Sequence, residues 1–136
     1  MSVRELSYGT AVTTTMSFDD AVARAKELLR DEGFGVLCEI DVQKTLKEKI
    51  GADFRPYVIL GACNPKLAHH ALSAESQLGL LLPCNVVVQQ DGERVIASAI
   101  DAEVLLGIVG QPELSDTARD VNARLSRVLA RLASAP

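Results

Sequence analysis

The sequence lacks the features that direct a protein to a membrane or out of the cell. Its first ten residues show no basic stretch followed by an apolar one, so no signal peptide is expected. No apolar run approaches the about 20 residues that a helix needs to cross a bilayer. We therefore expect a cytoplasmic protein with no membrane partner. In the cytoplasm its three cysteines are expected to be reduced, which argues against a structural disulfide.

An excess of positive charge is also missing. The chain carries 14 Lys and Arg against 18 Asp and Glu, a net charge of −4. Residues 115–136 are net +2 and the rest of the chain is net −6. Such an acidic body does not attract a phosphate backbone. Aromatic residues make up only 4% of the chain, and no basic strand studded with them is present to stack bases. We expect no nucleic-acid partner.

No motif of a known catalytic or cofactor site is present. Gly33-Phe34-Gly35 has only two glycines, and it follows a predicted helix and precedes a strand, which reverses the order of a dinucleotide fingerprint. A phosphate loop, a His-Glu-x-x-His helix and a Gly-x-Ser-x-Gly elbow are all missing. The sequence therefore favours a non-catalytic protein, and it identifies no cofactor.

What is present is the composition of an ordinary globular domain. The chain has 136 residues, of which 48% are hydrophobic and 24% charged. A chain of this length buries roughly two-thirds of its unfolded surface, so it needs no metal or disulfide to form a core. No linker, repeat or low-complexity tract divides it. We expect a single domain over residues 1–136.

Hydrophobic periodicity and turn residues predict the secondary structure. The predicted strands cover residues 5–15, 34–40, 56–62, 80–90 with an interruption at Pro83, and 94–100. Two long helices are predicted, one capped by Ser17 and ended by Gly33, the other capped by Ser115. Short helices are predicted at residues 42–50, 65–73 and 101–108.

The turn at Asp91-Gly92 decides between the classes of fold. Two strands joined by so short a turn must be antiparallel, which excludes a strictly parallel, doubly wound sheet. The economical arrangement is an α+β fold: a mostly antiparallel sheet with two long helices on one face, plus short connecting helices.

Four segments together resemble a known family. They are Gly33–Leu37, Ile40–Val42, Tyr57–Pro65 and Leu82–Val88, the last two containing Cys-Asn-Pro and Leu-Pro-Cys-Asn. This combination is similar to the family called domain of unknown function 302. The resemblance implies a β-α-β4-α fold like the TATA-binding-protein (TBP-like) class, and a homodimer. It implies no particular reaction and no DNA binding, because a fold does not determine a function.

The two Cys-Asn pairs are the candidate site: Cys63, Asn64, Cys84 and Asn85. Cys63 ends a predicted strand and precedes a helix N-terminus, where free amide groups favour a thiolate. If the ends of the two strands meet, Cys63 and Cys84 share a pocket. Such a pair could bind a soft metal ion, exchange disulfides or hold a small ligand.

A plainer interpretation competes with this one. Reduced cysteines are often buried apolar filler, and Cys38, alone in a strand, is expected to be such a residue. The spacing of Cys63 and Cys84 fits neither a Cys-x-x-Cys motif nor a zinc knuckle. His69 and His70 are adjacent on a helix and point about 100° apart, so they do not both face one metal ion. One of them could turn toward Cys63, but a solvated helix surface is expected.

These observations leave three hypotheses. The first is a homodimeric, non-catalytic module that binds a small molecule or a soft metal ion of unknown identity at Cys63, Asn64, Cys84 and Asn85. The alternative is a thiol-dependent redox or sulfur-handling enzyme with Cys63 as nucleophile and Cys84 as resolving thiol. The third is an interaction scaffold. The arginines of the last helix, at 124, 127 and 131, are expected to face solvent or to meet a partner subunit.

Overall fold

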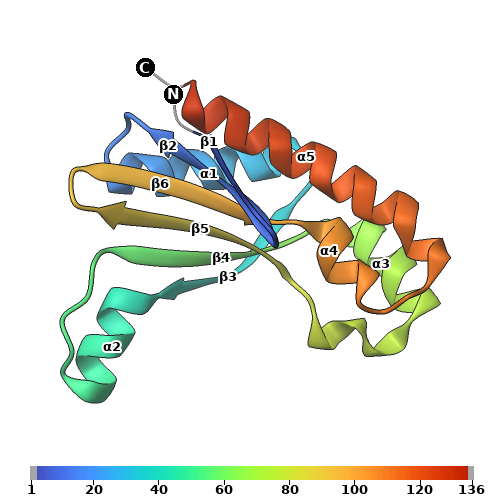
Figure 1. Ribbon diagram of the computed structural model, residues 1–136. Helices are drawn as coiled ribbons and strands as arrows, with labels where there is room; N and C mark the ends of the chain where they lie inside the picture. Colours follow the sequence, from blue (N-terminus) through green and yellow to red (C-terminus); the bar gives the residue numbers. More distant parts are fainter. Residues whose placement is uncertain (1–2, 135–136) are drawn as a thin grey trace.

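The computed structural model describes residues 3–134 and shows one six-stranded antiparallel sheet with two long helices on one face (Figure 1). The order of strands across the sheet is β1-β2-β6-β5-β4-β3, and all five pairings are antiparallel. The strands are β1 (Val3–Leu6), β2 (Gly9–Thr14), β3 (Gly35–Asp41), β4 (Tyr57–Cys63), β5 (Cys84–Asp91) and β6 (Arg94–Ile100).

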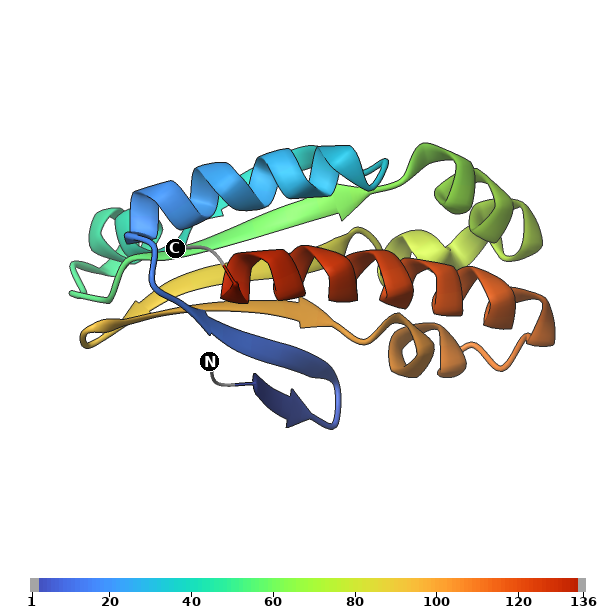
Figure 2. The ribbon, with the colours of Figure 1, turned by 90° about the horizontal axis from the view of Figure 1, so that it is seen from above.

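The long helices α1 (Phe18–Asp31) and α5 (Ser115–Ala133) lie side by side over the sheet (Figure 2). Helix α2 (Val42–Ile50) lies at one end of the molecule (Figure 1). The opposite end holds α3 (Pro65–Ala74), the 3-10 helices η1 (Ser76–Leu80) and η2 (Pro112–Leu114), and α4 (Ala102–Gly107). Within residues 3–134, no helix has the length and apolar character needed to cross a membrane.

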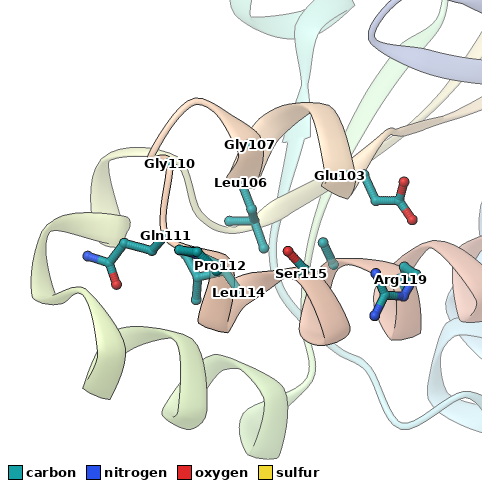
Figure 3. Close-up of a pocket in the computed structure, with 10 residues that line it drawn as sticks. Glu103, Leu106, Gly107, Gly110, Gln111, Pro112, Leu114, Ser115 and Arg119 are labelled. Carbon is teal, nitrogen blue, oxygen red and sulfur yellow. The ribbon is translucent and has the colours of Figure 1, made fainter.

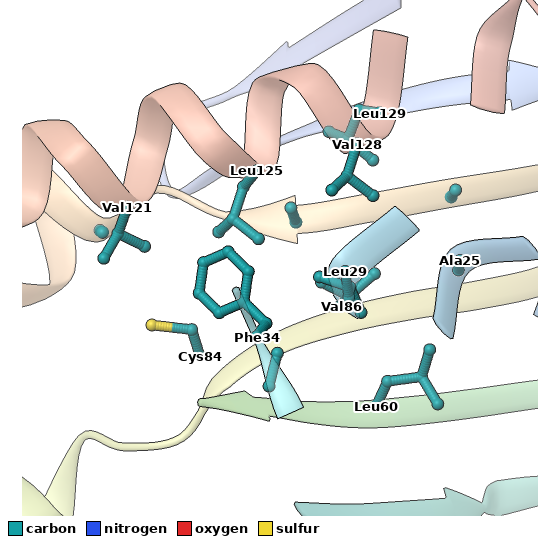
Figure 4. Packing of buried hydrophobic residues seen from close by; sticks show 14 of the residues in the cluster. Ala25, Leu29, Phe34, Leu60, Cys84, Val86, Val121, Leu125, Val128 and Leu129 are labelled. Carbon is teal, nitrogen blue, oxygen red and sulfur yellow. The ribbon is translucent and has the colours of Figure 1, made fainter. Parts of the chain in front are cut away.

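The core lies between the sheet and the two long helices (Figure 4). Alternate residues of the central strands point into it, so Leu60, Val86, Val88 and Ala97 are completely buried. Helix α1 contributes Ala21, Ala25, Leu28 and Leu29. Helix α5 buries all six residues that its helical spacing predicts for the core: Ala118, Val121, Leu125, Val128, Leu129 and Leu132. The α+β class, with both long helices on one face, is confirmed.

Local capping signals were predicted well. Ser17 Oγ accepts a hydrogen bond from the backbone N–H of Asp20 (3.2 Å), at the predicted start of α1. Asp41 and Asn64 cap α2 and α3 in the same way. Gly33 follows α1 with a φ of 86°, as expected for the residue that ends a helix. The likeness to the TATA-binding-protein class stays a prediction.

Three boundaries differ from the prediction. The expected strand at residues 5–15 is two strands joined by a turn at Ser7 and Tyr8. The expected strand at residues 80–90 begins only at Cys84, because η1 occupies residues 76–80 and a cis Leu82–Pro83 peptide separates the two. Ser115 is the first residue of α5 and not its cap, since η2 runs directly into the helix and Leu114 takes the cap position.

The arginines of α5 bind the end of α1 in the same chain. Arg127 donates hydrogen bonds from Nε and Nη2 to both carboxylate oxygens of Glu32 (3.0 and 2.8 Å). Arg124 Nη1 donates to the backbone carbonyl oxygen of Glu32 (2.6 Å), and Arg131 lies 3.7 Å from the carboxylate of Asp31. The arginine row expected to face solvent or a partner subunit therefore joins the two long helices.

This contact makes stability depend on pH. The hydrogen bonds from Arg127 hold the pKa of Glu32 below its ordinary value of 4.5. A carboxyl whose pKa is lowered by folding adds stability above its unfolded pKa, and that stability is lost as the pH falls through the folded pKa. We expect Glu32→Gln to lower the urea midpoint at pH 7. The deficit should shrink as the pH falls below 4.5, where Glu32 of the unaltered protein also becomes neutral.

The matched control is Glu27→Gln, which removes an exposed pair with Arg24 on α1 and should change the midpoint little. A deficit in Glu32→Gln that stays constant from neutral pH to pH 3, measured by urea unfolding, would contradict this account of the contact between the helices.

Candidate functional site

Three of the four predicted site residues lie together at one end of the sheet. Ala62 of β4 pairs with Cys84 of β5, which places Cys63 one residue beyond the pair, at the end of its strand. Asn64 follows as the cap of α3. Cys63, Asn64 and Cys84 line one pocket of about 40 Å³, so the predicted meeting of the two strand ends is found in the structure.

The rest of this pocket, here called the thiol pocket, is almost entirely apolar. Cys84 points from β5 toward α5 and lies beside Phe34 and Val121 (Figure 4). The other lining residues come from β4, α3, α4, α5 and the segment before β5: Ala62, Leu67, Ala68, Ala71, Leu82, Pro83, Leu106 and Thr117. No charged side chain lines the thiol pocket. It therefore suits a neutral, apolar group.

The thiol of Cys84 is held in its protonated form. Burial, with a smaller contribution from the neighbouring Cys63, raises the pKa of Cys84 to about 11. At neutral pH Cys84 is consequently a small apolar wall of the thiol pocket. A resolving cysteine or a thiolate metal ligand would need the deprotonated form, which this environment disfavours.

Asn64 is engaged in local structure. Its Oδ1 accepts a hydrogen bond from the backbone N–H of Leu67 (3.3 Å), which caps α3. Its side-chain amide also lies against Gly33 at the end of α1. Asn64 thus fixes the position of α3, one wall of the thiol pocket, relative to α1.

Asn85 lies away from the other three. Successive residues of a strand point to opposite faces, so Cys84 faces the helices and Asn85 faces the uncovered side of the sheet. There Asn85 lines a separate hollow of about 240 Å³ with Tyr8, Tyr57 and Ser98. Because neighbouring residues of a strand point to opposite faces, the sequence could have predicted that Asn85 and Cys84 lie on different sides of the sheet.

Cys38 also lies on the uncovered side of the sheet. It is exposed rather than buried filler, and it sits opposite Gly61 in the β3–β4 ladder. A Cβ atom at position 61 would lie 2.6 Å from Cys38 Sγ and 2.9 Å from the ring of Pro83. The thiol can rotate but the ring cannot, so position 61 has room only for glycine.

The two histidines lie on the surface of α3 and do not line the thiol pocket. His69 and His70 are exposed on α3, where solvent was expected. Among residues 3–134, no group of three or more His, Cys, Asp or Glu side chains is placed to hold a metal ion.

A larger groove of about 390 Å³ runs between α4 and the start of α5 (Figure 3). Glu103 and Arg119 lie toward one end and Gln111 at the other (Figure 3). Arg119 pairs with Asp116 on its own helix, and Gln111 Nε2 donates to Glu75 Oε1 (3.2 Å). The side chains of Arg119 and Gln111 are therefore engaged within the chain. No sequence signal indicated the groove.

The environment of Cys84 predicts the order in which the thiols react. At pH 8 a thiol with a pKa of about 11 is about one-thousandth thiolate, so Cys84 should alkylate about 100-fold more slowly in the folded protein than in urea. Exposed Cys38 should react promptly in both. Iodoacetamide labelling followed by peptide mass spectrometry measures both rates. Equal alkylation rates at Cys38 and Cys84 in the folded protein would disprove the assignment of Cys84 as a buried, protonated thiol.

Comparison with known proteins gives the family. No functionally curated protein matches the chain. The crystal structure of an uncharacterized conserved protein DUF302 from Bacillus stearothermophilus is similar, with a TM-score of 0.87 and 34% sequence identity over 93% of this chain and 99% of that chain. The family model described as domain of unknown function DUF302 matches residues 10–132. The chain therefore belongs to the DUF302 family.

Proposed function

We propose that this protein is a non-catalytic module that binds a small, neutral, apolar ligand in the thiol pocket. The observation that carries the proposal is the pocket itself, an apolar hollow with no charged lining residue at the junction of β4, β5, α3 and α5. Asn64 is its polar corner, and the protonated thiol of Cys84 is one of its walls. Apolar pockets with few, well-placed polar groups are typical small-molecule sites.

The size of the thiol pocket limits the ligand. A volume of about 40 Å³ takes roughly three water-sized groups. A methyl-ended or similarly small group fits as the structure stands. The wall most easily moved is α3, which has Ala71 as its single buried residue within the described part of the chain. An outward shift of α3 would admit a longer ligand without disturbing the sheet.

The chemistry of the thiol pocket favours a small molecule over a soft metal ion. Cys63 and Cys84 are its two thiols, and no third His, Cys, Asp or Glu in residues 3–134 is placed beside them to complete a metal site. Deprotonating Cys84 for a metal also works against its burial. The same raised pKa weakens the redox alternative, because a resolving thiol acts as its thiolate.

Xenon is a suitable probe, because it is apolar, uncharged and small. In ¹⁵N-labelled protein under xenon pressure, we expect saturable shifts at the amides of Cys63, Cys84 and Val121, which surround the thiol pocket. Ala68→Leu places a larger side chain in the lining and should weaken these shifts several-fold. The control is Ala130→Leu, an exposed position of α5 outside the pocket, which should leave them unchanged.

If Ala68→Leu only displaces α3, Ala71→Leu fills the thiol pocket from a buried position. Xenon shifts that never saturate, or that persist in both filled variants, would overturn the proposal.

We also propose that the module is a homodimer formed through β3. This strand is an edge of the sheet, and its backbone groups on that side pair with no other strand in the described part of the chain. Leu37 and Ile40 are 68% and 45% exposed on it. Its charged residues are engaged within the chain, since Glu39 pairs with Lys26 and Asp41 caps α2. What β3 offers a partner is therefore apolar.

A second copy is the occupant that matches this edge, because two β3 strands related by a twofold axis pair antiparallel and continue the sheet. Light scattering should give twice the mass of 14.6 kDa. Combining Leu37→Lys with Ile40→Lys should give the monomer, while Leu80→Lys, at an exposed position of η1, should not. A mass of 14.6 kDa for the unaltered protein would rule the dimer out.

A further inference from the structure

The side of the sheet that α1 and α5 leave uncovered carries a second hollow region. Two hollows of about 240 and 310 Å³ lie along it, and they share Leu6, Tyr8, Gln89 and Ser98. They therefore form one continuous depression, here called the open-face trough. It lies on the opposite side of β5 from the thiol pocket, because Asn85, Val87 and Gln89 alternate with Cys84, Val86 and Val88.

The open-face trough exists because its floor is built from small residues. Ala11 of β2 pairs with Ser98 of β6, and Gly9 lies two residues before Ala11 in β2. A Cβ atom at position 9 would lie 2.6 Å from the carbonyl oxygen of Ala99, so the floor cannot be filled there. Larger side chains from both sides, Tyr8 and Tyr57 among them, form the walls.

One end of the open-face trough is positively charged. Arg4 and Arg94 line it, and neither hollow is lined by an Asp or Glu residue, although the chain as a whole is net −4. Arg94 is partly neutralised by Asp91, whose carboxylate lies 3.3 Å away. Arg4 forms no ion pair with any of residues 3–134. A free guanidinium beside a hollow without acids attracts an anion, and its planar donors match a carboxylate or phosphate.

The other end is neutral and able to form hydrogen bonds. Asn85, Tyr8 and Tyr57 line it, together with the apolar side chains of Val87 and Ile100. The side chains of Asn85 and Ser98 form no hydrogen bond with another residue of the described chain, so their donors and acceptors are available to a ligand. Aromatic walls with neutral polar groups favour a flat or ring-shaped body.

We propose that the open-face trough binds a small organic anion. Its carboxylate or phosphate group lies at Arg4 and Arg94, and its uncharged ring lies between Tyr8 and Tyr57 over Ser98. The two hollows, about 240 and 310 Å³, fall near the lower end of the size range of small-molecule sites. This site is independent of the proposed apolar ligand, which occupies the other side of the sheet.

The probes are phenyl phosphate, benzoate and uncharged benzamide, titrated into ¹⁵N-labelled protein at low ionic strength. One or both anions should shift the amides of Gly9, Gln89 and Ser98 at millimolar concentration, and the tighter of the two identifies the preferred anionic group. Benzamide should bind about tenfold more weakly, which is the difference expected from one charge-assisted hydrogen bond.

Arg4→Gln should weaken anion binding about tenfold, and Arg30→Gln, an exposed position of α1 on the other side of the sheet, should not. Ala11→Val raises the floor of the open-face trough and should weaken all three probes, with its fold checked by thermal unfolding. If Ala11→Val does not fold, anion binding by Arg4→Gln still tests the proposal.

Three results would overturn the proposal. The first is anion binding that Arg4→Gln leaves unchanged, and the second is the absence of a shift from either anion. The third is a trough covered by a second copy of the chain, which light scattering would reveal as a dimer broken by Ala11→Val but not by substitutions in β3.

Discussion

Burial of one face of a six-stranded sheet beneath two helices is the constraint on which the rest of the structure depends. Both helices must approach the sheet closely, and alanines at the contact make this possible. Ala21 and Ala25 of α1 and Ala97 of β6 are completely buried. Because successive side chains of a strand point to opposite faces, every residue of β4, β5 and β6 points either toward the helices or toward the uncovered side of the sheet. Each candidate site follows from that division.

Local signals were sufficient for most of the elements. Caps and stops depend on a few neighbouring residues, so Ser17, Asp41 and Asn64 could be recognised without knowing the fold. The prediction of one strand over residues 5–15 was wrong because a run rich in β-branched residues hides the turn at Ser7 and Tyr8. Ser115 was predicted to cap the last helix, but the 3-10 helix η2 runs directly into α5, so Leu114 takes the cap position.

The candidate site was predicted in part. The sequence could bring Cys63 and Cys84 together because each begins a Cys-Asn pair at the end of a predicted strand, and the structure places both in one pocket. Asn85 could have been excluded by counting along its strand. The open-face trough could not be found in this way. Arg4 and Gln89 line the same hollow only because β1 and β2 lie beside β6 in the sheet. No local sequence pattern predicts that order of strands.

The pairing of β2 with β6 has a consequence for how the protein is made. Val12 pairs with Ala97, which lies 85 residues further along the chain, and α5 contacts both strands. A nascent chain on the ribosome therefore holds β2 without its neighbour until β6 has emerged. The helix-facing side of the sheet stays incomplete until α5 has left the exit tunnel. The fold therefore cannot close before α5 has emerged, and a product truncated before α5 would keep its apolar face open to aggregation.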